Sequence, residues 1–164
     1  MSRILHLIRR FVLSIWPGGP GLDDEAWARA SLLSGEVVLW AKMSGPDRRH
    51  AVAVARRVER ALGGAGRPIL AAALLHDVGK IVSGLSVPTR VVATIFGLVG
   101  GRRVWSGNGR IACYLRHPEI GAQILAEAGS DTVTVAWTAE HHLPRDRWTV
   151  DRRIGEALRA ADDD

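Results

Sequence analysis

The stretch PILAAALLHDVGKI, residues 68–81, decides the fold. Proline suits the first turn of a helix, and the seven residues after it are all apolar, which predicts a helix that is buried on every side. A His-Asp pair, His76 and Asp77, follows directly. A carboxylate at the border of a core needs a partner, and a metal ion can be that partner. The stretch therefore predicts a central helix with candidate metal ligands at its end.

The rest of the chain is also patterned as helices. Apolar residues recur at helical spacing, and no alternating strand pattern longer than four residues is present. We predict an all-α fold, a compact single-domain bundle of about seven or eight helices. The expected helices include residues 23–33, 35–43, 88–99, 118–128 and 151–161, and one whose apolar face is formed by Ala51, Val54, Ala55, Val58, Ala61 and Leu62.

Length and composition narrow the class of protein and the kind of site. The chain has 164 residues, which suits one domain, and 47% of them are hydrophobic, which excludes a disordered polar chain. A single cysteine excludes an intramolecular disulfide and a zinc site built of thiolates alone. No apolar stretch approaches the roughly 18–20 residues of a membrane-spanning helix. We therefore expect a cytoplasmic protein, with peripheral membrane contact through residues 1–16 as an alternative.

Glycine and proline divide the chain into three parts. The PGGPG stretch, residues 17–21, separates an N-terminal amphipathic helix at residues 1–16 from a helical lead-in at residues 17–46. The main domain is expected over residues 47–164. Three interpretations of the N-terminal helix stay open: packing on its own domain or a partner, lying on an anionic membrane surface, or being a processed targeting segment.

Arginine dominates the net charge of +5, since only two of the 22 basic residues are lysines. The arginines crowd residues 48–60 and 145–153. A basic rim around a pocket would attract phosphate-bearing substrates, and the alternative is an ordinary solvated helix face. There is no strong signal for nucleic-acid binding, because the chain has few aromatic residues and no recognised binding motif. The aromatic residues are six tryptophans, two phenylalanines and one tyrosine.

Histidines fall where helices are expected to begin or end. Imidazole and carboxylate are ligands of first-row divalent metals, and a helical bundle can bring such side chains from several helices into one pocket. The carboxylates would come from Asp77 and from Asp162, near the end of the last helix. The histidines are His50 and His117, expected to open helices, and His76, His141 and His142, expected to close them.

At these residues the chain resembles a known family. The motif HDVGKI, residues 76–81, is similar to the signature of the HD superfamily of metal-dependent phosphohydrolases, whose pattern is a histidine, a His-Asp pair and a distant aspartate. The blocks HPEIGAQIL and EHHLP, residues 117–125 and 140–144, resemble the HD-GYP branch. The GYP triplet itself is missing, since LPRDRW follows the histidine pair. The resemblance covers residues 47–162 and implies that residues 47–164 form an HD domain of the helical-bundle type.

The resemblance implies a site for two divalent transition-metal ions, with iron or manganese favoured. Lys80 matches the lysine that lies beside the substrate phosphate in the family. His142 or His141 is an alternative proton donor to the leaving oxygen, and a neighbouring aspartate in the terminal run is an alternative to Asp162. The implied ligands are His50, His76, Asp77 and Asp162 for one ion, and Asp77 as a bridge with His117, His141 and His142 for the other.

The function that this resemblance implies is hydrolysis of a phosphoester by metal-activated hydroxide. The expected partner is a small-molecule phosphoester of the nucleotide or cyclic nucleotide class. Cyclic di-GMP is disfavoured, because the acid and the GYP triplet that accompany its hydrolysis are missing. Two alternatives stay open: a di-iron oxygenase of the HD fold, and a signalling or interaction module that keeps the fold without turnover.

Overall fold

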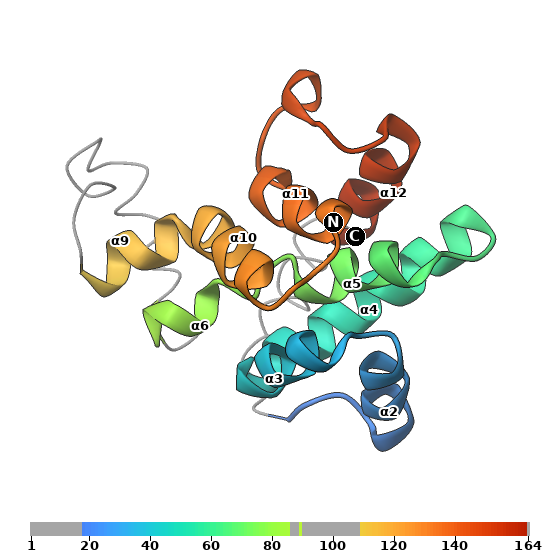
Figure 1. The fold of residues 1–164 in the computed structure, drawn as a ribbon. Helices are drawn as coiled ribbons and strands as arrows, with labels where there is room; N and C mark the ends of the chain where they lie inside the picture. Colours follow the sequence, from blue (N-terminus) through green and yellow to red (C-terminus); the bar gives the residue numbers. More distant parts are fainter. Residues whose placement is uncertain (1–17, 86–88, 90–108, 164) are drawn as a thin grey trace, which may run out of the picture.

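The computed structural model describes residues 18–85, 89 and 109–163 (Figure 1). The expected helix at residues 1–16 lies outside the described residues. The expected helix at residues 88–99 does too, apart from residue 89. Within the described residues there is no strand, and eight α-helices are longer than one turn, which confirms the all-α class. The elements are α2 Leu22–Ala30, α3 Ser34–Lys42, α4 Gly45–Leu62, α5 Arg67–Leu75, the single-turn α6 Lys80–Ser83, α9 Arg110–Leu115, α10 His117–Glu127, α11 Thr132–Glu140, the 3-10 helix η1 Arg145–Arg147 and α12 Arg152–Asp163.

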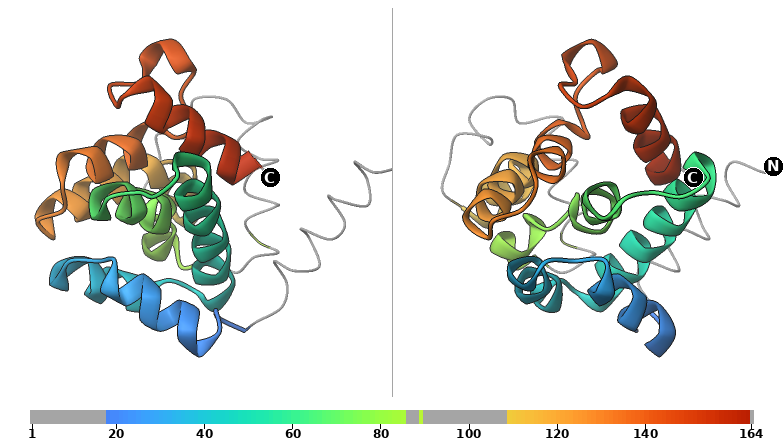
Figure 2. Two further views of the ribbon diagram at one scale, coloured as in Figure 1. Left: turned by 90° about the vertical axis from the view of Figure 1, so that its right-hand side faces the viewer. Right: turned by 45° about the vertical axis from the view of Figure 1, so that its right-hand side comes forward.

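Helix α5 lies at the centre of the molecule, as its apolar sequence predicts. It packs against α4 on one side and α11 on the other, while α12 lies along α4 (Figures 1 and 2). Pro68 stands in its first turn, where a missing N–H costs nothing. Every residue from Leu70 to Leu75 is buried. The end of this helix, and the His-Asp pair after it, is therefore held inside the bundle.

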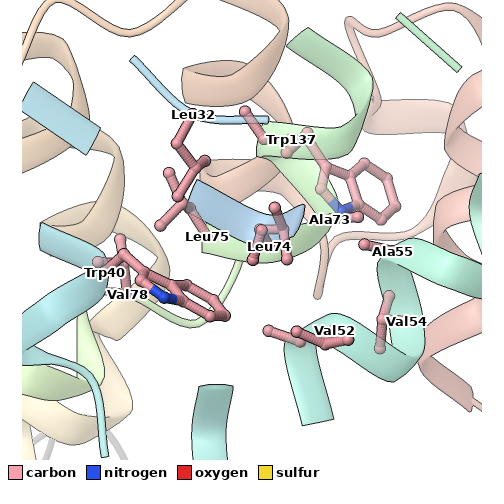
Figure 3. Close-up of a cluster of buried hydrophobic side chains, with 14 of the residues drawn as sticks. Leu32, Trp40, Val52, Val54, Ala55, Ala73, Leu74, Leu75, Val78 and Trp137 are labelled. Carbon is pink, nitrogen blue, oxygen red and sulfur yellow. The ribbon is translucent and has the colours of Figure 1, made fainter. Parts of the chain in front are cut away.

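The hydrophobic core surrounds α5 (Figure 3). Trp40 from α3 and Trp137 from α11 are its largest buried side chains, and both contact the same core as Leu74 and Leu75. Burying a side chain of this size contributes about 1.5–3 kcal/mol. Packing in this core therefore fixes the orientations of α4, α5 and α11, and with them the positions of the helix ends.

Helix α4 shows how local sequence sets the ends of an element. Ser44 is its N-cap and accepts a hydrogen bond from the backbone N–H of Asp47 at 3.3 Å. Gly63 ends it in the left-handed conformation, with φ of 69°. Val54 and Val58 are buried as expected, but Ala61 is exposed, so that part of the predicted apolar face is wrong. Ala61 lies in the last turn, beside an exposed glycine turn that nothing covers among the described residues.

The predicted helix over residues 23–33 is too long, because α2 ends at Ala30. The hydroxyl of Ser31 donates to the carbonyl oxygen of Trp27 at 3.0 Å, which satisfies the end of the helix. Leu32 is nevertheless buried, in the turn between α2 and α3. The apolar character of Leu32 predicted its burial correctly. Its spacing fits a helical pattern, but Leu32 lies in a turn and not in a helix.

Arginines of α4 hold α2 in place. Arg48 pairs with Glu25 at 3.2 Å, and Arg56 pairs with Asp24 at 3.2 Å. The Arg56 guanidinium also lies over the ring of Trp27, 3.6 Å from its centroid. These arginines make contacts within the fold. Arg48 and Arg56 therefore contribute to packing between helices more than to the basic rim expected from residues 48–60. Among the described residues no helix has the length and apolar character needed to cross a membrane.

Candidate metal centre

The structure brings all the expected ligands to one place, at the C-terminal end of α5. They come from elements that lie up to 112 positions apart in the chain. His50 does not open a helix, contrary to expectation, because α4 begins five residues earlier and His50 lies in its second turn. The others are His76 and Asp77 after α5, His117 as the first residue of α10, His141 and His142 after α11, and Asp162 in the last turn of α12.

One group of ligands surrounds His76. Asp162 Oδ1 lies 2.9 Å from His50 Nε2 and 3.5 Å from His76 Nε2. Asp77 Oδ2 lies 3.5 Å from His76 Nε2. One ligand atom each from His50, His76 and Asp77 falls within 4.8 Å of the others, a spacing that could hold a metal ion. Asp162 completes this group from the opposite end of the domain sequence.

A second group lies on the other side of Asp77. His117 Nε2 is 3.2 Å from Asp77 Oδ1, and His141 Nε2 is 3.8 Å from the same oxygen. Ligand atoms of His117, His141 and His142 lie within 4.8 Å of one another. Asp77 therefore turns one oxygen to each group, which is the arrangement of a carboxylate that bridges two cations.

Backbone carbonyl groups fix the orientation of three histidine rings. A carbonyl oxygen can only accept, so each of these rings carries a proton on Nδ1, and in the neutral ring this leaves Nε2 with a lone pair for a metal ion. All three Nε2 atoms point into the two groups. The pairs are His76 Nδ1 to Ala73 O at 2.9 Å, His117 Nδ1 to Tyr114 O at 2.8 Å, and His141 Nδ1 to Thr138 O at 2.8 Å.

The residues present fit a divalent metal ion. Within the described structure, His117 Nε2 and His141 Nε2 are buried and have no hydrogen-bond partner. The nearby Asp77 oxygen does not satisfy them, because a lone pair then faces a carboxylate oxygen, another acceptor. An unsatisfied buried polar atom costs about 1–3 kcal/mol. A cation between the nitrogens and the carboxylate would remove that cost at both atoms.

The electrostatics separate the histidines into two kinds. Burial opposes the protonation of His76, but the carboxylates of Asp77 and Asp162 outweigh it and raise its pKa to about 9. Burial and the neighbouring charge of His76 lower the pKa of His141 to about 2. His142 is the exposed member of its group, yet partial burial of its ring and the nearness of His117 lower its pKa to about 4.

The two carboxylates stay ionised. Burial opposes ionisation of Asp77, but Lys80 and His76 overcome it and hold its pKa well below the usual range. In Asp162 the hydrogen bonds from His50 and His76 likewise overcome burial and lower the pKa. The centre therefore offers anionic oxygens together with imidazole nitrogens, which is the donor set of first-row divalent metals. His141 and His142 are neutral, whereas His76 would lose its Nε2 proton when an ion binds.

Lys80 lies beside the bridging carboxylate. Its ammonium group donates to Asp77 Oδ2. Burial disfavours the charged form, but the attraction of Asp77 prevails and raises the pKa of Lys80. Lys80 is the first residue of α6, which starts directly after the HD turn. The cation is thus placed at the edge of the centre by the same turn that places His76 and Asp77.

Two glycines allow the HD turn to approach α10. A Cβ atom on Gly79 would overlap the carbonyl oxygen of His117, and one on Gly121 would lie 2.8 Å from Thr138 Cγ2 and 3.1 Å from the Gly79 nitrogen. The sequence analysis gave neither glycine a role in the site. Their positions in HDVGK and HPEIG were the available signal. The close contact is what brings His117 within reach of Asp77.

Three further residues that the sequence analysis missed support the histidine pair. Glu140 is buried and accepts from the backbone N–H of Thr149 at 2.7 Å and from its hydroxyl at 2.5 Å. Arg159 of α12 donates to the carbonyl oxygen of His141. These contacts tie the segment after α11 to the helix that carries Asp162. An acid directly before a histidine pair was the sequence signal for Glu140.

Comparison with known proteins agrees with this geometry. A family model described as the HD domain matches residues 48–163 of the chain. It gives no support for the HD-GYP branch in particular. No curated protein and no solved structure matches the chain. The match covers well over half of the sequence and includes every candidate ligand, so the chain belongs to the HD domain family, whose members are typically metal-dependent phosphohydrolases.

Proposed function

We propose that this protein is a dinuclear metal-dependent phosphohydrolase or phosphodiesterase that acts on a nucleotide-like substrate. One observation carries the proposal: Asp77 turns its two oxygens to two separate groups of histidines. The buried Nε2 atoms of His117 and His141, which have no partner in the described structure, support an ion in the second group. A single-metal site does not need a carboxylate that faces two groups of ligands. The HD-GYP likeness adds the expectation of a second ion and rests on the sequence blocks alone.

Each ion has a set of ligands in reach. Iron and manganese suit the mixture of imidazole and carboxylate. The first ion would be held by His50, His76, Asp77 and Asp162, and the second by Asp77, His117, His141 and His142.

Two divalent ions bound here would supply an activated water and neutralise charge that develops on the phosphoryl group. The chain itself contributes Lys80, whose ammonium can donate to a phosphoryl oxygen when substrate competes with Asp77 for it. With its pKa lowered to about 4, His142 is neutral near pH 7 and is better suited to bind a metal than to donate a proton. We therefore assign His142 to the second ion and Lys80 to the substrate.

The charge of the chain favours an anionic, nucleotide-like substrate. Its support is the net charge of +5 and the cation beside the bridging carboxylate, both of which favour an anionic substrate. The missing GYP triplet argues against cyclic di-GMP. A screen should therefore include nucleotides, cyclic nucleotides, cyclic dinucleotides and a simple aryl phosphodiester.

The test combines elemental analysis with this screen. Purified protein should contain up to two transition-metal ions per chain and hydrolyse at least one phosphoester. The His76→Ala, Asp77→Ala double variant should lose both metal and activity, whereas the exposed control Gln123→Ala should keep both.

Two results would contradict the proposal. Iron-loaded protein that consumes oxygen with an organic phosphonate or polyol, and leaves phosphoesters intact, would identify an oxygenase. Metal-loaded protein that neither hydrolyses nor oxidises anything in the screen would favour a binding module.

A further inference from the structure

Tyr114, the one tyrosine of the chain, borders the metal centre without a role in binding the ions. It lies in α9, and its carbonyl oxygen accepts the Nδ1 proton of His117 at 2.8 Å. Its ring is stacked on the ring of His117, with centroids 5.7 Å apart and planes inclined by 25°. Both the backbone and the side chain of Tyr114 therefore contact His117, a candidate ligand of the second group.

Contacts between α9 and α6 place Tyr114 and Lys80 on adjoining helices. Arg110, at the start of α9, donates to the carbonyl oxygen of Ser83 at 2.9 Å and to that of Gly84, which fastens it to the end of α6. Tyr114 is four residues after Arg110 and so lies on the same face of α9. Lys80 is three residues before Ser83, on the matching side of α6. Tyr114 lies near enough to Lys80 that its ionised phenolate form would stabilise the ammonium and help to raise the pKa of Lys80.

The phenol group is available for a ligand. Tyr114 is half-buried, and no group in the described part of the chain makes a hydrogen bond with its hydroxyl. A phenol O–H is a good donor to an anionic oxygen. The Lys80 ammonium, on the adjoining helix, is bonded to Asp77. An ammonium that is bonded to Asp77 and a hydroxyl whose ring is stacked on His117 thus lie on neighbouring helices.

We propose that the Tyr114 hydroxyl is a substrate-binding group, which donates a hydrogen bond to a non-bridging oxygen of a phosphoryl group held at Asp77, beside the Lys80 ammonium. The stacking on His117 positions this hydroxyl. The inference rests on the proposed function, because it takes a phosphoryl group as the ligand. It adds a second donor from the chain to the one that the HDVGK motif supplies.

The variant Tyr114→Phe tests this, because it removes the hydroxyl and keeps the ring that stacks on His117. Inorganic phosphate is titrated calorimetrically into metal-loaded wild type and variant. A hydrogen bond to a charged group accounts for a change in affinity of about tenfold or more, so the variant should bind phosphate about tenfold more weakly. Metal content and Tm should be unchanged, and kcat/KM should fall by a similar factor. The exposed α10 variant Gln123→Ala should match the wild type throughout.

The outcomes separate this inference from the proposed function. Equal phosphate affinity in Tyr114→Phe and wild type would overturn the inference while leaving hydrolysis by the wild type intact. A lower metal content or a lower Tm in the variant would also overturn the inference. So would the absence of phosphate binding by metal-loaded wild type. If loaded wild type binds phosphate in a Tyr114-dependent manner but hydrolyses no phosphoester, the inference holds and the proposed function fails.

Discussion

At the scale of single residues, the centre depends on which atoms face each other. Asp77 places its two oxygens between two groups of histidines, and Asp162 places Oδ1 between His50 and His76. Asp163, the next residue, instead pairs with Arg159 at 3.3 Å on an exposed surface. Neighbouring carboxylates at the end of α12 therefore have different surroundings, and this difference can be measured.

Asp162→Asn and Asp163→Asn form a matched pair. The first removes the negative charge between two histidines of the first group, and the second weakens a surface ion pair, which is worth at most about 1 kcal/mol. Because changing a group that merely supports a ligand already costs about 10–100-fold in metal affinity, Asp162→Asn should cost at least tenfold. Metal titration of both variants measures this. Equal affinity in the two would mean that Asp162 is no ligand.

His76 gives the metal-free protein a characteristic pH dependence. Its pKa of about 9 in the folded state is above the ordinary 6.5, so its contribution to stability is complete below pH 6.5 and is lost as the pH rises through 9. The lowered pKa values of Asp77 and Asp162 act oppositely, and their contribution is lost as the pH falls below the ordinary 3.8.

The Tm of chelator-treated protein should therefore be highest near pH 6.5 and should fall by a few degrees toward pH 9.5. It should also fall toward pH 4, because folding keeps His141 and His142 neutral, with pKa values lowered to about 2 and about 4, whereas both take up protons when unfolded. In the control His76→Gln the decline above pH 6.5 should be much smaller. A Tm of the metal-free wild type that rises between pH 6.5 and pH 9 would contradict the raised pKa of His76.

At the scale of elements, the distance between the two groups of ligands depends on how closely α10 approaches the turn after α5. Gly79 and Gly121 make this contact, and a side chain at either position would meet neighbouring atoms. The helix α10 carries His117 at its start, so any displacement of the helix moves that ligand away from Asp77. Packing and metal binding are thus coupled through one helix contact.

Gly121→Ala should destabilise the fold by about 1–3 kcal/mol, because its Cβ would meet Thr138 Cγ2 at 2.8 Å and the Gly79 backbone. It should also weaken binding of the second metal ion. Urea unfolding and metal titration measure the two effects. Gly109→Ala is the control, since no atom of the described residues lies within 4 Å of its added Cβ. A Gly121→Ala variant as stable as this control would show that α10 can shift freely.

At the scale of the whole molecule, the proposed ions join five helices that pack around α5 or end beside it. The ligands stem from α4, the end of α5, α10, the end of α11 and α12. Arg57 adds a hydrogen bond from α4 to the carbonyl oxygen of Ala161 at 3.1 Å, so α12 is fastened to the bundle next to Asp162. Metal binding is then expected to stabilise the fold as a unit.

Addition of manganese or ferrous iron to metal-free protein should raise its Tm. At about 100 times the Kd, one site contributes about 2.7 kcal/mol, which corresponds to a rise of roughly 5–10 °C for a chain of this size. Thermal unfolding at several metal concentrations measures it. The Asp77→Asn variant, which lacks the bridging charge, should show little rise. A wild-type Tm that is independent of metal would contradict the metal centre.

Much of the fold and part of the candidate site could be read from the sequence. The all-α class follows from helical spacing and from the apolar stretch of residues 69–75, because these patterns act locally. The candidate ligands follow from residue type and from the HD family motif. Local patterns are less reliable at the ends of elements, where hydrogen bonds and turns compete with spacing. This is why the predicted helix over residues 23–33 is too long and why His50 lies inside a helix.

The tertiary structure supplies what depends on residues that are distant in the chain. It directs the two oxygens of Asp77 to different groups and sets Asp162 apart from Asp163. It pairs the α4 arginines with acids of α2, and it stacks Tyr114 on His117. These arrangements arise only when helices pack. Residue types and local spacing therefore identify the donors, whereas the packing of α4, α10 and α12 around the end of α5 determines which atoms face one another.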